Sequence, residues 1–540
     1  MMRFFYIVFC FLTVAIQAQN PYVSEVWVAD NGDGTYKNPI IYADYSDPDV
    51  IRVNDDYFMT ASSFNCMPAL PILHSKDMVN WKIVNHALKE QLPADTYNMP
   101  QHGNGVWAPS IRFHKGEFYI FWGDPDFGIY QVKTKNPLGE WEKPVLVTEG
   151  KGLIDPCPFW DDNGDAYLVH AYAGSRAGVK SLLSINKMNP EGTKVLDVGV
   201  HVFDGHENHD TVEGPKLYKR NGFYFIFAPA GGVATGWQLV LRSKNIYGPY
   251  EEKIVLEQGS TKINGPHQGA WVETSNNEHW FYHFQDVGAV GRIVHLQPMV
   301  WKNDWPFIGK DVDKNGIGEP VASHKKPSID VKNPIFTPQE SDFFDGFNIG
   351  FQWQWQANPN VVWHAKLPGN NFLRLFAIKS VADTENKWRM PNLLLQKFPA
   401  PEFKATTKIT LHPEEAKTGK KAGLIVMGLD VAAVDISHDE AGFFVQQTET
   451  NEADKGNREQ INQTVRLKSN EVYFRMEYAS KEGWCQFYFS ENNQNYQKIG
   501  KPFKAKEGKW IGAKVGLFCT STLEAQRGGY AAVDFFTITK

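Results

Sequence analysis

The chain has 540 residues, a formal net charge of −6 at pH 7, 14% aromatic residues and 17 Trp. This length provides for two to four domains, each long enough to bury a core. Acidic and basic residues are interspersed and leave no basic face, so a nucleic acid is not the expected partner. Trp residues pack in β-sheets or stack on flat ligands such as sugars, and the composition by itself leaves both uses open.

The first 18 residues are typical of a signal peptide. Arg3 supplies a positive charge, residues 4–16 are apolar, and Ala18 ends a small-residue cleavage motif. The apolar stretch is shorter than the roughly 20 residues that a membrane-spanning helix needs. We therefore expect an exported protein, periplasmic or secreted, without a membrane span. Lipidation at Cys10 is the alternative, although this residue lies early in the apolar stretch.

Four cysteines follow the signal: Cys66, Cys157, Cys485 and Cys519. They are widely scattered and have no spacing that is typical of a metal site. We expect buried free thiols, with pairing of Cys485 and Cys519 as the alternative.

The chain after the signal favours β-strands, and one pattern recurs five times. A polar residue, a short strand, a polar turn and an aromatic strand follow one another, with starts 48 to 60 residues apart. The copies are DPDVIRVNDDYFMTAS from Asp47, WAPSIRFHKGEFYIFWG from Trp107, DPCPFWDDNGDAYLVHAY from Asp155, EGPKLYKRNGFYFIFAP from Glu213 and HQGAWVETSNNEHWFYHFQ from His267. Their turns are rich in Asn, Asp and Gly, which tolerate the positive φ of tight hairpins.

The second half of each unit repeats as well, for example ILHSKDMVNWKIV at 72–84 and LVLRSKNIYGPYEEKIVL at 239–256. Five units of this length predict an all-β, five-bladed β-propeller over residues 36–325. A segment rich in Lys, Pro and Asp follows and is interpreted as a linker. Strands without the repeat then predict a jelly-roll or concanavalin-A-like β-sandwich over residues 340–540.

The five repeat starts, Asp47, Trp107, Asp155, Glu213 and His267, are predicted to be equivalent positions of the five blades. The first strands of the blades line the propeller axis, so these residues are expected to converge at one mouth of the channel. Three of the five are carboxylic acids. An acid before Pro is also a common turn signal, but three at one repeat position favour a shared site.

Clustered carboxylates at a funnel that water can reach are what glycoside hydrolysis requires. One acid donates a proton to the leaving oxygen, and one ionised group activates a water molecule. A third negative group raises the pKa of the acid and helps keep it protonated. Carboxylates spread around a propeller axis could have the roughly 6.5–9.5 Å spacing of an inverting enzyme.

The motifs YSDPDVIRV, LPILHSKDMVNW, VWAPSIR, LIDPCPFW, VEGPKLYKRNGFYFIFAPAGG, GPHQGAW and GRIVHLQPMVW together resemble glycoside hydrolase family 43. The resemblance covers nearly all of the mature chain. It is strongest to the β-xylosidase and α-L-arabinofuranosidase branch with a C-terminal concanavalin-A-like sandwich. It implies that Asp47 is the general base, Asp155 the pKa modulator and Glu213 the general acid of an inverting reaction.

The resemblance also assigns binding roles. Arg292 matches the family arginine that binds hydroxyls of the terminal sugar, and His267 matches a channel histidine that faces a calcium ion or water in some relatives. We predict no required cofactor or catalytic metal, with a structural Ca²⁺ near His267 as an alternative. Trp107, Phe64 and Phe127 are candidates for stacking on the sugar.

The expected function is exo-acting release of a terminal pentose, α-L-arabinofuranose or β-D-xylose, from plant cell-wall polysaccharide or its oligosaccharides. An endo-arabinanase and a non-catalytic glycan-binding propeller are the alternatives. In the resembling branch, the C-terminal domain packs on the propeller and sends a loop towards the pocket rim, which favours exo attack. Independent glycan binding by its Trp-rich sandwich is the other interpretation.

Overall fold

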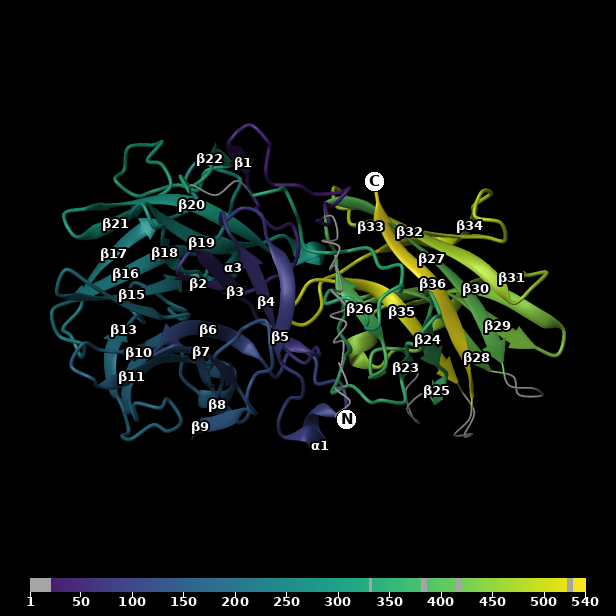
Figure 1. Ribbon diagram of the computed structural model, residues 1–540, viewed down its shortest axis with the longest axis horizontal. Helices are drawn as coiled ribbons and strands as arrows, with labels where there is room; N and C mark the ends of the chain where they lie inside the picture. Colours follow the sequence, from purple (N-terminus) through teal and green to yellow (C-terminus); the bar gives the residue numbers. More distant parts are fainter. Residues whose placement is uncertain (1–20, 330–332, 380–385, 414–418, 522–527) are drawn as a thin grey trace, which may run out of the picture.

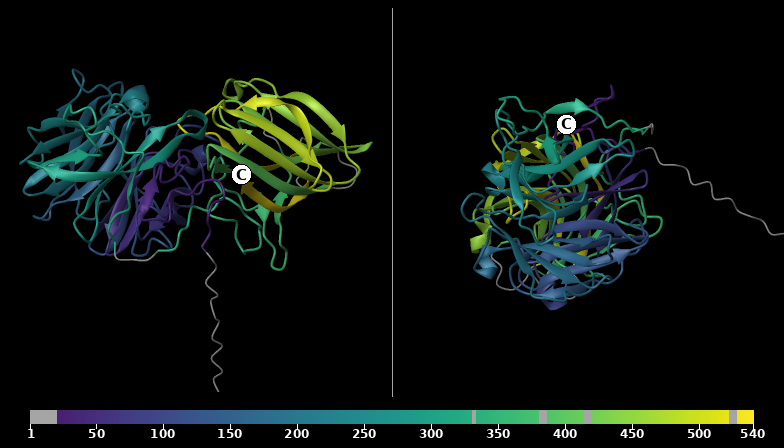
Figure 2. Two further views of the ribbon diagram at one scale, coloured as in Figure 1. Left: turned by 90° about the horizontal axis from the view of Figure 1, so that it is seen from above. Right: turned by 90° about the vertical axis from the view of Figure 1, so that its left-hand side faces the viewer.

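The computed structural model describes residues 21–329, 333–379, 386–413, 419–521 and 528–540. Two β-domains lie side by side, with the first half of the chain on the left of Figure 1 and the C-terminal part on the right. The views of Figure 2 show the same arrangement. The predicted signal peptide, residues 1–18, lies outside the described residues.

The N-terminal domain consists of five antiparallel sheets of four strands, each ordered as in the chain. Blade 1 contains β2 (Asp49–Val53), β3 (Asp56–Thr60), β4 (Ala69–Ser75) and β5 (Lys82–Leu88). Blade 2 contains β6 (Trp107–His114), β7 (Glu117–Asp124), β8 (Gly128–Thr134) and β9 (Val145–Glu149). Blade 3 contains β10 (Leu153–Trp160), β11 (Ala166–Tyr172), β12 (Leu182–Met188) and β13 (Val200–Asp204).

Blade 4 contains β14 (Lys216–Arg220), β15 (Phe223–Ala230), β16 (Trp237–Ser243) and β17 (Glu251–Leu256), and blade 5 contains β18 (Trp271–Glu273), β19 (His279–Asp286), β20 (Arg292–Lys302) and β21 (Trp305–Ile308). The first strands adjoin one another around the axis, with β6 between β2 and β10, and β18 beside β2. The predicted five-bladed propeller is therefore confirmed.

The turns of the first hairpins explain why the repeat folds into blades. Asn54, Asn221 and Asn277 have φ angles of 57°, 51° and 60°. Asn reaches this left-handed region more readily than most residues, so each turn reverses the chain between a short strand and an aromatic strand. The aromatic strands then bury their side chains between neighbouring blades.

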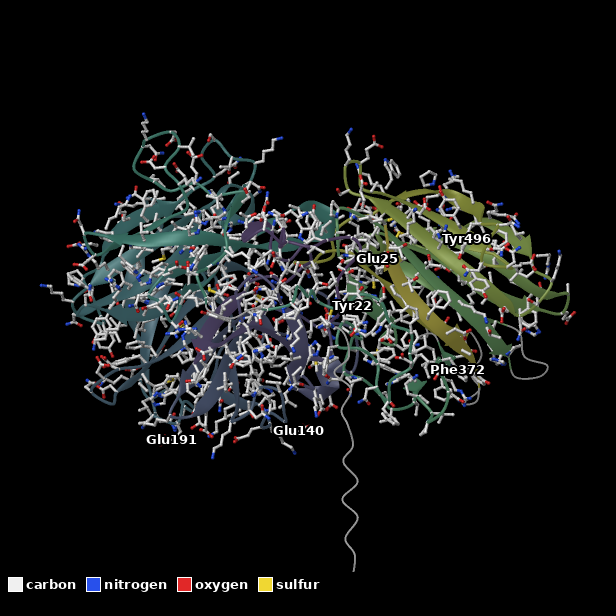
Figure 3. All side chains as sticks on the ribbon, turned by 45° about the horizontal axis from the view of Figure 1, so that its top comes forward. Tyr22, Glu25, Glu140, Glu191, Phe372 and Tyr496 are labelled. Carbon is white, nitrogen blue, oxygen red and sulfur yellow. The ribbon has the colours of Figure 1, made fainter. Side chains whose placement is uncertain are left out.

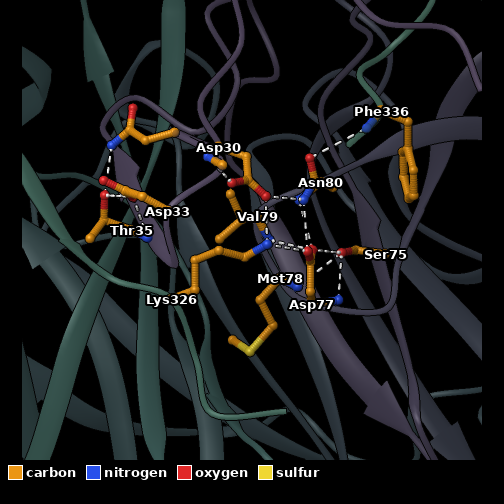
Figure 4. Close-up of polar contacts among 12 residues, drawn as sticks. Asp30, Asp33, Thr35, Ser75, Asp77, Met78, Val79, Asn80, Lys326 and Phe336 are labelled. Carbon is orange, nitrogen blue, oxygen red and sulfur yellow. Dashed lines mark hydrogen bonds and ion pairs between the residues drawn. The ribbon is translucent and has the colours of Figure 1, made fainter. Parts of the chain in front are cut away.

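A polar network closes the ring next to blade 1 (Figure 4). Strand β1 (Thr35–Lys37) pairs with β22 (Ser323–Lys325), which follows the last blade. Lys326 Nζ lies 2.5 Å from Asp30 Oδ2 and 2.7 Å from Asp77 Oδ2, and Asn80 Nδ2 donates to Asp30. Segments from the two ends of the propeller are thereby joined to its first blade.

The C-terminal domain is a sandwich of two sheets whose strands are mostly antiparallel. One sheet has the order β23 (His364–Ala365), β24 (Leu373–Phe376), β36 (Gly529–Thr539), β27 (Glu402–Pro413), β32 (Glu471–Ala479), β33 (Trp484–Ser490) and β34 (Gln497–Lys504). The other has the order β25 (Ile378–Lys379), β35 (Lys514–Ser521), β28 (Lys420–Met427), β29 (Val431–Asp439), β30 (Gly442–Thr450) and β31 (Gln460–Arg466), with β26 (Leu394–Lys397) also paired to β35.

Helical structure in the described ranges is confined to single turns: α1 (Ala94–Tyr97), α2 (Gly174–Ala177), α3 (Gly232–Thr235) and the 3₁₀ turns Gly288–Val290 and Ala453–Lys455. Among the residues that the structure describes, no helix has the length and apolar character needed to cross a membrane.

The Trp residues that suggested glycan binding by the sandwich are buried. Trp353, Trp355, Trp363 and Trp388 have exposed fractions of 1–8%, and the first three belong to the main sandwich core. Burial of such large apolar surfaces stabilises the domain, and it leaves these four side chains no free face for a sugar. The four described cysteines are buried free thiols, so the alternative pairing of Cys485 with Cys519 is wrong.

The two domains dock through backbone and side-chain hydrogen bonds. Met67 and Trp355 exchange two backbone hydrogen bonds of 2.9 and 2.6 Å. Tyr22 and Glu25 lie between the domains in Figure 3, where Ser24 donates a hydrogen bond to Glu340. Burial raises the pKa of Glu340 to about 8. Polar groups at this junction are therefore buried and paired.

A further contact is made by the loop between β34 and β35, called here the sandwich loop (residues 505–513). Gly512 N–H donates to Asp44 Oδ2 at 2.9 Å, and Ala513 N–H donates to the Ala289 carbonyl at 2.7 Å. A Cβ atom at Gly512 would lie 2.3 Å from the Val290 carbonyl oxygen. The close approach of the two backbones therefore depends on glycine.

We expect Gly512→Ala to lower the stability of the docked protein, because its methyl group meets rigid backbone. Overpacking of this kind costs about 1–3 kcal/mol. Calorimetry should show a lower Tm for Gly512→Ala than for the control Gly346→Ala, whose Cβ would lie 3.6 Å from its nearest neighbour. Equal Tm values for the two variants would contradict this account of the docking contact.

Candidate active site

Each blade begins at one backbone position with a left-handed conformation, called here the start position. Its φ is between 30° and 58° in all five blades. The next residue is Pro in blades 1 to 4 and Gly in blade 5. The start positions are Asp47, Ala108, Asp155, Gly214 and Gln268.

This register corrects the equivalence that the sequence predicted. Trp107 pairs with Gly123 and Ile154 with Ala171 across their hairpins, so Trp107 corresponds to Ile154 and not to Asp155. Glu213 N–H and His267 N–H donate to the carbonyls of Pro229 and Phe284 in the same way. Trp107, Glu213 and His267 therefore directly precede the start positions of their blades. The repeat starts predicted from the sequence therefore differ in register by one residue between these three residues and the pair Asp47 and Asp155.

All three predicted catalytic carboxylates nevertheless line one pocket, of about 230 Å³. The lining residues are Asp47, Phe64, Trp107, Ala108, Ile154, Asp155, Thr211, Glu213, Gly232, Val233, Gln268, Arg292 and Trp510. Pockets for drug-sized molecules measure roughly 300–1,000 Å³, so this smaller pocket suits a ligand as small as one sugar ring. The carboxylates converge on a single mouth of the propeller channel.

Two serine hydroxyls hold one oxygen of Asp47. Ser62 Oγ lies 2.5 Å and Ser46 Oγ 2.9 Å from Asp47 Oδ2. The Ala108 N–H donates to Ser62 Oγ, and Arg292 donates to Ser46 Oγ. A hydroxyl has one proton, so both hydroxyl protons are directed to the carboxylate. Asp47 Oδ2 is thus occupied, and Oδ1 is the oxygen left for other partners.

Arg292 is the first residue of β20 and is 9% exposed. Its Nη1 lies 3.6 Å from Asp47 Oδ1, and its guanidinium lies 4.9 Å from the centre of the Phe284 ring. Its backbone N–H donates to Asp44, the residue that also receives the Gly512 N–H. The guanidinium is therefore held at the pocket wall with donors available to a polar ligand.

Asp155 is 3% exposed, and its Oδ2 accepts the Gly214 N–H at 2.8 Å. Burial raises the pKa of Asp155 well above its usual range, and the neighbouring carboxylates Glu213 and Asp47 raise it further. The Gly214 N–H and Lys216 oppose this rise. The charges of Glu213 and Asp47 therefore both act on the buried Asp155 carboxyl group.

Glu213 is the most accessible of the three carboxylates, with 27% of its side chain exposed. Its Oε1 lies 3.0 Å from Nε2 of His267, whose side chain is buried. His267 Nδ1 has no hydrogen-bond partner within the described chain. The imidazole therefore orients the Glu213 carboxyl group, and the other oxygen of that group can reach the pocket.

The structure places two of the three predicted stacking residues at the pocket and the third elsewhere. Phe64 and Trp107 both line the pocket, and their ring centres lie 6.4 Å apart. Phe127 is not among the lining residues. Its ring lies 6.3 Å from that of Tyr97 and packs against the core between blades 1 and 2. The prediction that Phe127 contacts the sugar is therefore replaced by a packing role.

Trp510, Gln268 and Ser62 are among the lining or supporting residues that the sequence did not indicate. Trp510 belongs to the sandwich loop, is 52% exposed and lies 6.2 Å from Trp107 between ring centres. The expected loop from the C-terminal domain towards the rim is thus present. Its pocket residue could not be read from the sequence, because Trp510 is far along the chain from every blade. The sequence signal that could have identified Gln268 is its place in the fifth copy of the repeat, directly after His267.

Metal binding finds little support in the described residues. No group of three or more His, Cys, Asp or Glu side chains among them is arranged to hold a metal ion. Calcium requires about six to eight oxygen ligands, and the partner of His267 is the single carboxylate of Glu213. Backbone carbonyls and water also bind calcium, so a structural Ca²⁺ near His267 stays a prediction.

Comparison with known proteins identifies the family. Residues 36–306 match the model described as glycosyl hydrolases family 43. The chain is a member of glycosyl hydrolase family 43. Residues 341–539 of this family 43 protein match the model described as the beta xylosidase C-terminal concanavalin A-like domain.

Relatives of this family 43 chain match it over most of its length. A protein of Xylanibacter ruminicola is 40% identical over 92% of this chain and 88% of its own, and a beta-xylosidase of Formosa agariphila is 33% identical over 94% and 91%. The non-reducing end alpha-L-arabinofuranosidase BoGH43B of Bacteroides ovatus is 29% identical over 74% and 75%. The crystal structure of the family 43 protein BlXynB from Bacillus licheniformis superposes with a TM-score of 0.79 at 25% identity, over 94% of this chain and 99% of its own.

The raised pKa of Asp155 predicts a pH-dependent cost to stability. A carboxyl group with a higher pKa in the folded than in the unfolded protein keeps its proton on folding. The free energy of unfolding therefore falls as the pH rises from the unfolded value of about 3.9 towards the folded value. We expect Asp155→Asn, which still accepts the Gly214 N–H, to abolish this fall. Tm measured between about pH 4 and pH 8 should decline less in Asp155→Asn than in the wild type.

The matched control is Asp55→Asn, since Asp55 is exposed in the first hairpin of blade 1. This variant should keep the pH dependence of the wild type. A parallel pH dependence in Asp155→Asn and the wild type would show that burial of this carboxyl group has no such cost.

Proposed function

We propose that this glycosidase is an exo-acting, inverting enzyme that removes a terminal pentose from plant hemicellulose or its oligosaccharides. The observation that carries the proposal is the convergence of Asp47, Asp155 and Glu213 from three blades on one small pocket. Trp510 from the second domain stands at the same pocket. This arrangement favours a chain end over an internal stretch of a polymer.

The surroundings of each carboxylate support separate roles. Asp47 accepts hydrogen bonds from two serine hydroxyls, which hold its carboxylate in a fixed orientation. We assign it as the general base that activates water. Glu213 is more accessible, and we assign it as the general acid that protonates the leaving oxygen. Asp155 accepts the Gly214 N–H and so sets the backbone next to Glu213, and we assign it as the group that modulates this acid.

Arg292, Trp107 and Phe64 are proposed to bind the terminal sugar. The guanidinium offers donors to hydroxyl groups, and the two aromatic side chains offer apolar faces to the ring. His267 is proposed to position Glu213. No metal is required for these steps, in which a water molecule attacks the anomeric carbon on the face opposite the departing oxygen.

The names of the relatives favour β-D-xylose over α-L-arabinofuranose as the released sugar. The Formosa agariphila relative is named beta-xylosidase, whereas the Bacteroides ovatus relative is named for α-L-arabinofuranose. We therefore propose β-D-xylose as the first candidate and α-L-arabinofuranose as the second. Aryl β-xyloside and aryl α-arabinofuranoside, followed by xylo-oligosaccharides, arabinan and arabinoxylan, will distinguish them. Proton NMR of the first product should show the inverted anomer.

The same substrates test the two alternatives. Internal cleavage of arabinan into oligosaccharides would indicate an endo-arabinanase. Binding of polysaccharide without release of any sugar would indicate a glycan-binding propeller. Either result would overturn the proposal of an exo-acting pentosidase.

We also propose that the protein is exported to the periplasm or the medium. The support is the charged, apolar and small-residue pattern of residues 1–18. Sequencing of the mature N-terminus in the exported fraction tests this, and full-length protein confined to the cytoplasm would contradict it.

Removal of the general acid should affect poor leaving groups most. We expect Glu213→Gln to lose about 10²- to 10⁴-fold in kcat on xylo-oligosaccharides, the usual contribution of general acid catalysis. The loss should be far smaller on an aryl glycoside whose leaving group needs no proton. Glu207→Gln, at an exposed position of the preceding loop, is the control and should keep wild-type rates. Wild-type rates in Glu213→Gln would refute the assignment.

The hydroxyl of Ser62 should support Asp47. A hydrogen bond to a charged group contributes about 1.5–3 kcal/mol, so we expect Ser62→Ala to lose at least about tenfold in kcat/KM. The control is Ser63→Ala, whose equally buried hydroxyl accepts the Leu70 N–H instead. Wild-type kcat/KM in Ser62→Ala would argue against this role.

A further inference from the structure

Gln268 occupies the start position of blade 5, where blades 1 and 3 have Asp47 and Asp155. It lines the pocket and is only 4% exposed. Its Oε1 is buried and has no hydrogen-bond partner among the described residues. The oxygen of this amide is thus unpaired at the wall of the pocket that holds the three carboxylates.

An unpaired amide at this place is costly for the fold. Burying a polar group without a partner costs free energy, so almost all such groups in proteins are paired. The residue also has φ 30°, a conformation that residues other than glycine rarely adopt. Strained and unpaired groups concentrate at functional sites, where a ligand completes them.

The propeller itself does not need a long polar side chain at a start position. Blade 2 has Ala108 and blade 4 has Gly214 at the same place, and both blades form. The side chain of Gln268 also requires Gly214 as its neighbour. A Cβ atom at Gly214 would lie 2.4 Å from Gln268 Cγ and 2.5 Å from its Nε2. The amide is therefore seated against the backbone that links Glu213 to blade 4.

An amide and a sugar hydroxyl are complementary, because each can donate and accept. Rotation of the amide by about 180° around its last bond exchanges the oxygen and the nitrogen, so either atom can face the pocket. Sugar-binding sites combine apolar faces with a few such polar groups. Phe64 and Trp107 supply the apolar faces here, and Arg292 supplies donors but no acceptor.

We propose that the side-chain amide of Gln268 binds one hydroxyl group of the terminal pentose and contributes to the choice of sugar. The inference rests on the proposed function, and it adds a binding group that can accept as well as donate. Gln268 makes no bond to a reacting atom in this assignment. Its contribution is a hydrogen bond that one hydroxyl makes and that a deoxy sugar lacks.

The test combines Gln268→Met with substrates that each lack one hydroxyl of the terminal pentose. Met has a similar length and no hydrogen-bonding amide. In the wild type, removal of the recognised hydroxyl should lower kcat/KM about tenfold, as expected for one hydrogen bond. In Gln268→Met, kcat/KM on the parent substrate should be about tenfold lower, and removal of that same hydroxyl should change it less than about twofold. Removal of the other hydroxyls should cost both enzymes the same factor.

Two further variants keep the test decisive. Gln238→Met changes a buried glutamine of β16 outside the pocket, and it should keep the wild-type response to every deoxy substrate. If Gln268→Met does not fold, Gln268→Ala reproduces the residue that blade 2 has at this position. Circular dichroism and Tm will show which variants are folded.

The outcomes separate this inference from the proposed function. If the wild type releases pentose and every deoxy substrate loses the same factor in wild type and folded Gln268 variants, the amide binds no hydroxyl and the inference fails alone. Wild-type kcat/KM in a folded Gln268 variant would likewise show that the amide binds no hydroxyl. If the wild type releases no pentose from any substrate, the proposed function and this inference both fail.

Discussion

The functional pocket depends on one backbone constraint, the left-handed residue with which every blade begins. At this point the chain turns from a loop into the innermost strand, and the Pro or Gly that follows limits how it continues. The five-fold repetition places five such residues around one axis. Their side chains and those of the preceding residues therefore meet at one mouth of the channel. Two acids, one accessible glutamate and one amide are brought together by the same local geometry.

A second constraint couples this mouth to the other domain. The two oxygens of Asp44 accept the N–H groups of Arg292 and Gly512. One buried carboxylate thus connects the segment before blade 1, the start of β20 and the sandwich loop. The chain that leads into Asp47, the arginine at the pocket wall and the loop that carries Trp510 cannot shift independently. The C-terminal domain is therefore part of the site as well as a stabilising neighbour.

The three carboxyl groups of the pocket have different electrostatic surroundings. Asp47 and Asp155 share the start position, yet their surroundings differ. Serine hydroxyls surround one oxygen of Asp47, whereas burial and two neighbouring carboxylates raise the pKa of Asp155. Glu213 is more open and is held by a buried imidazole. The three carboxyl groups of one pocket therefore have three different environments, as separate acid and base roles on a glycosidic bond require.

The sequence alone determined the two β-domains, the five blades, the three carboxylates and Arg292, because the turn chemistry, the repeat and the family motifs are local. It did not determine the register to within one residue, since a polar residue stands at the start position in three blades, while polar or aromatic residues also stand directly before it, as Trp107, Glu213 and His267 do. It also assigned Phe127 to the sugar, although this ring packs against Tyr97. Trp510, Ser62 and Gln268 became visible only in the tertiary structure. Their roles arise from contacts between residues far apart in the chain, and no local pattern specifies which distant backbone or side chain a group will meet.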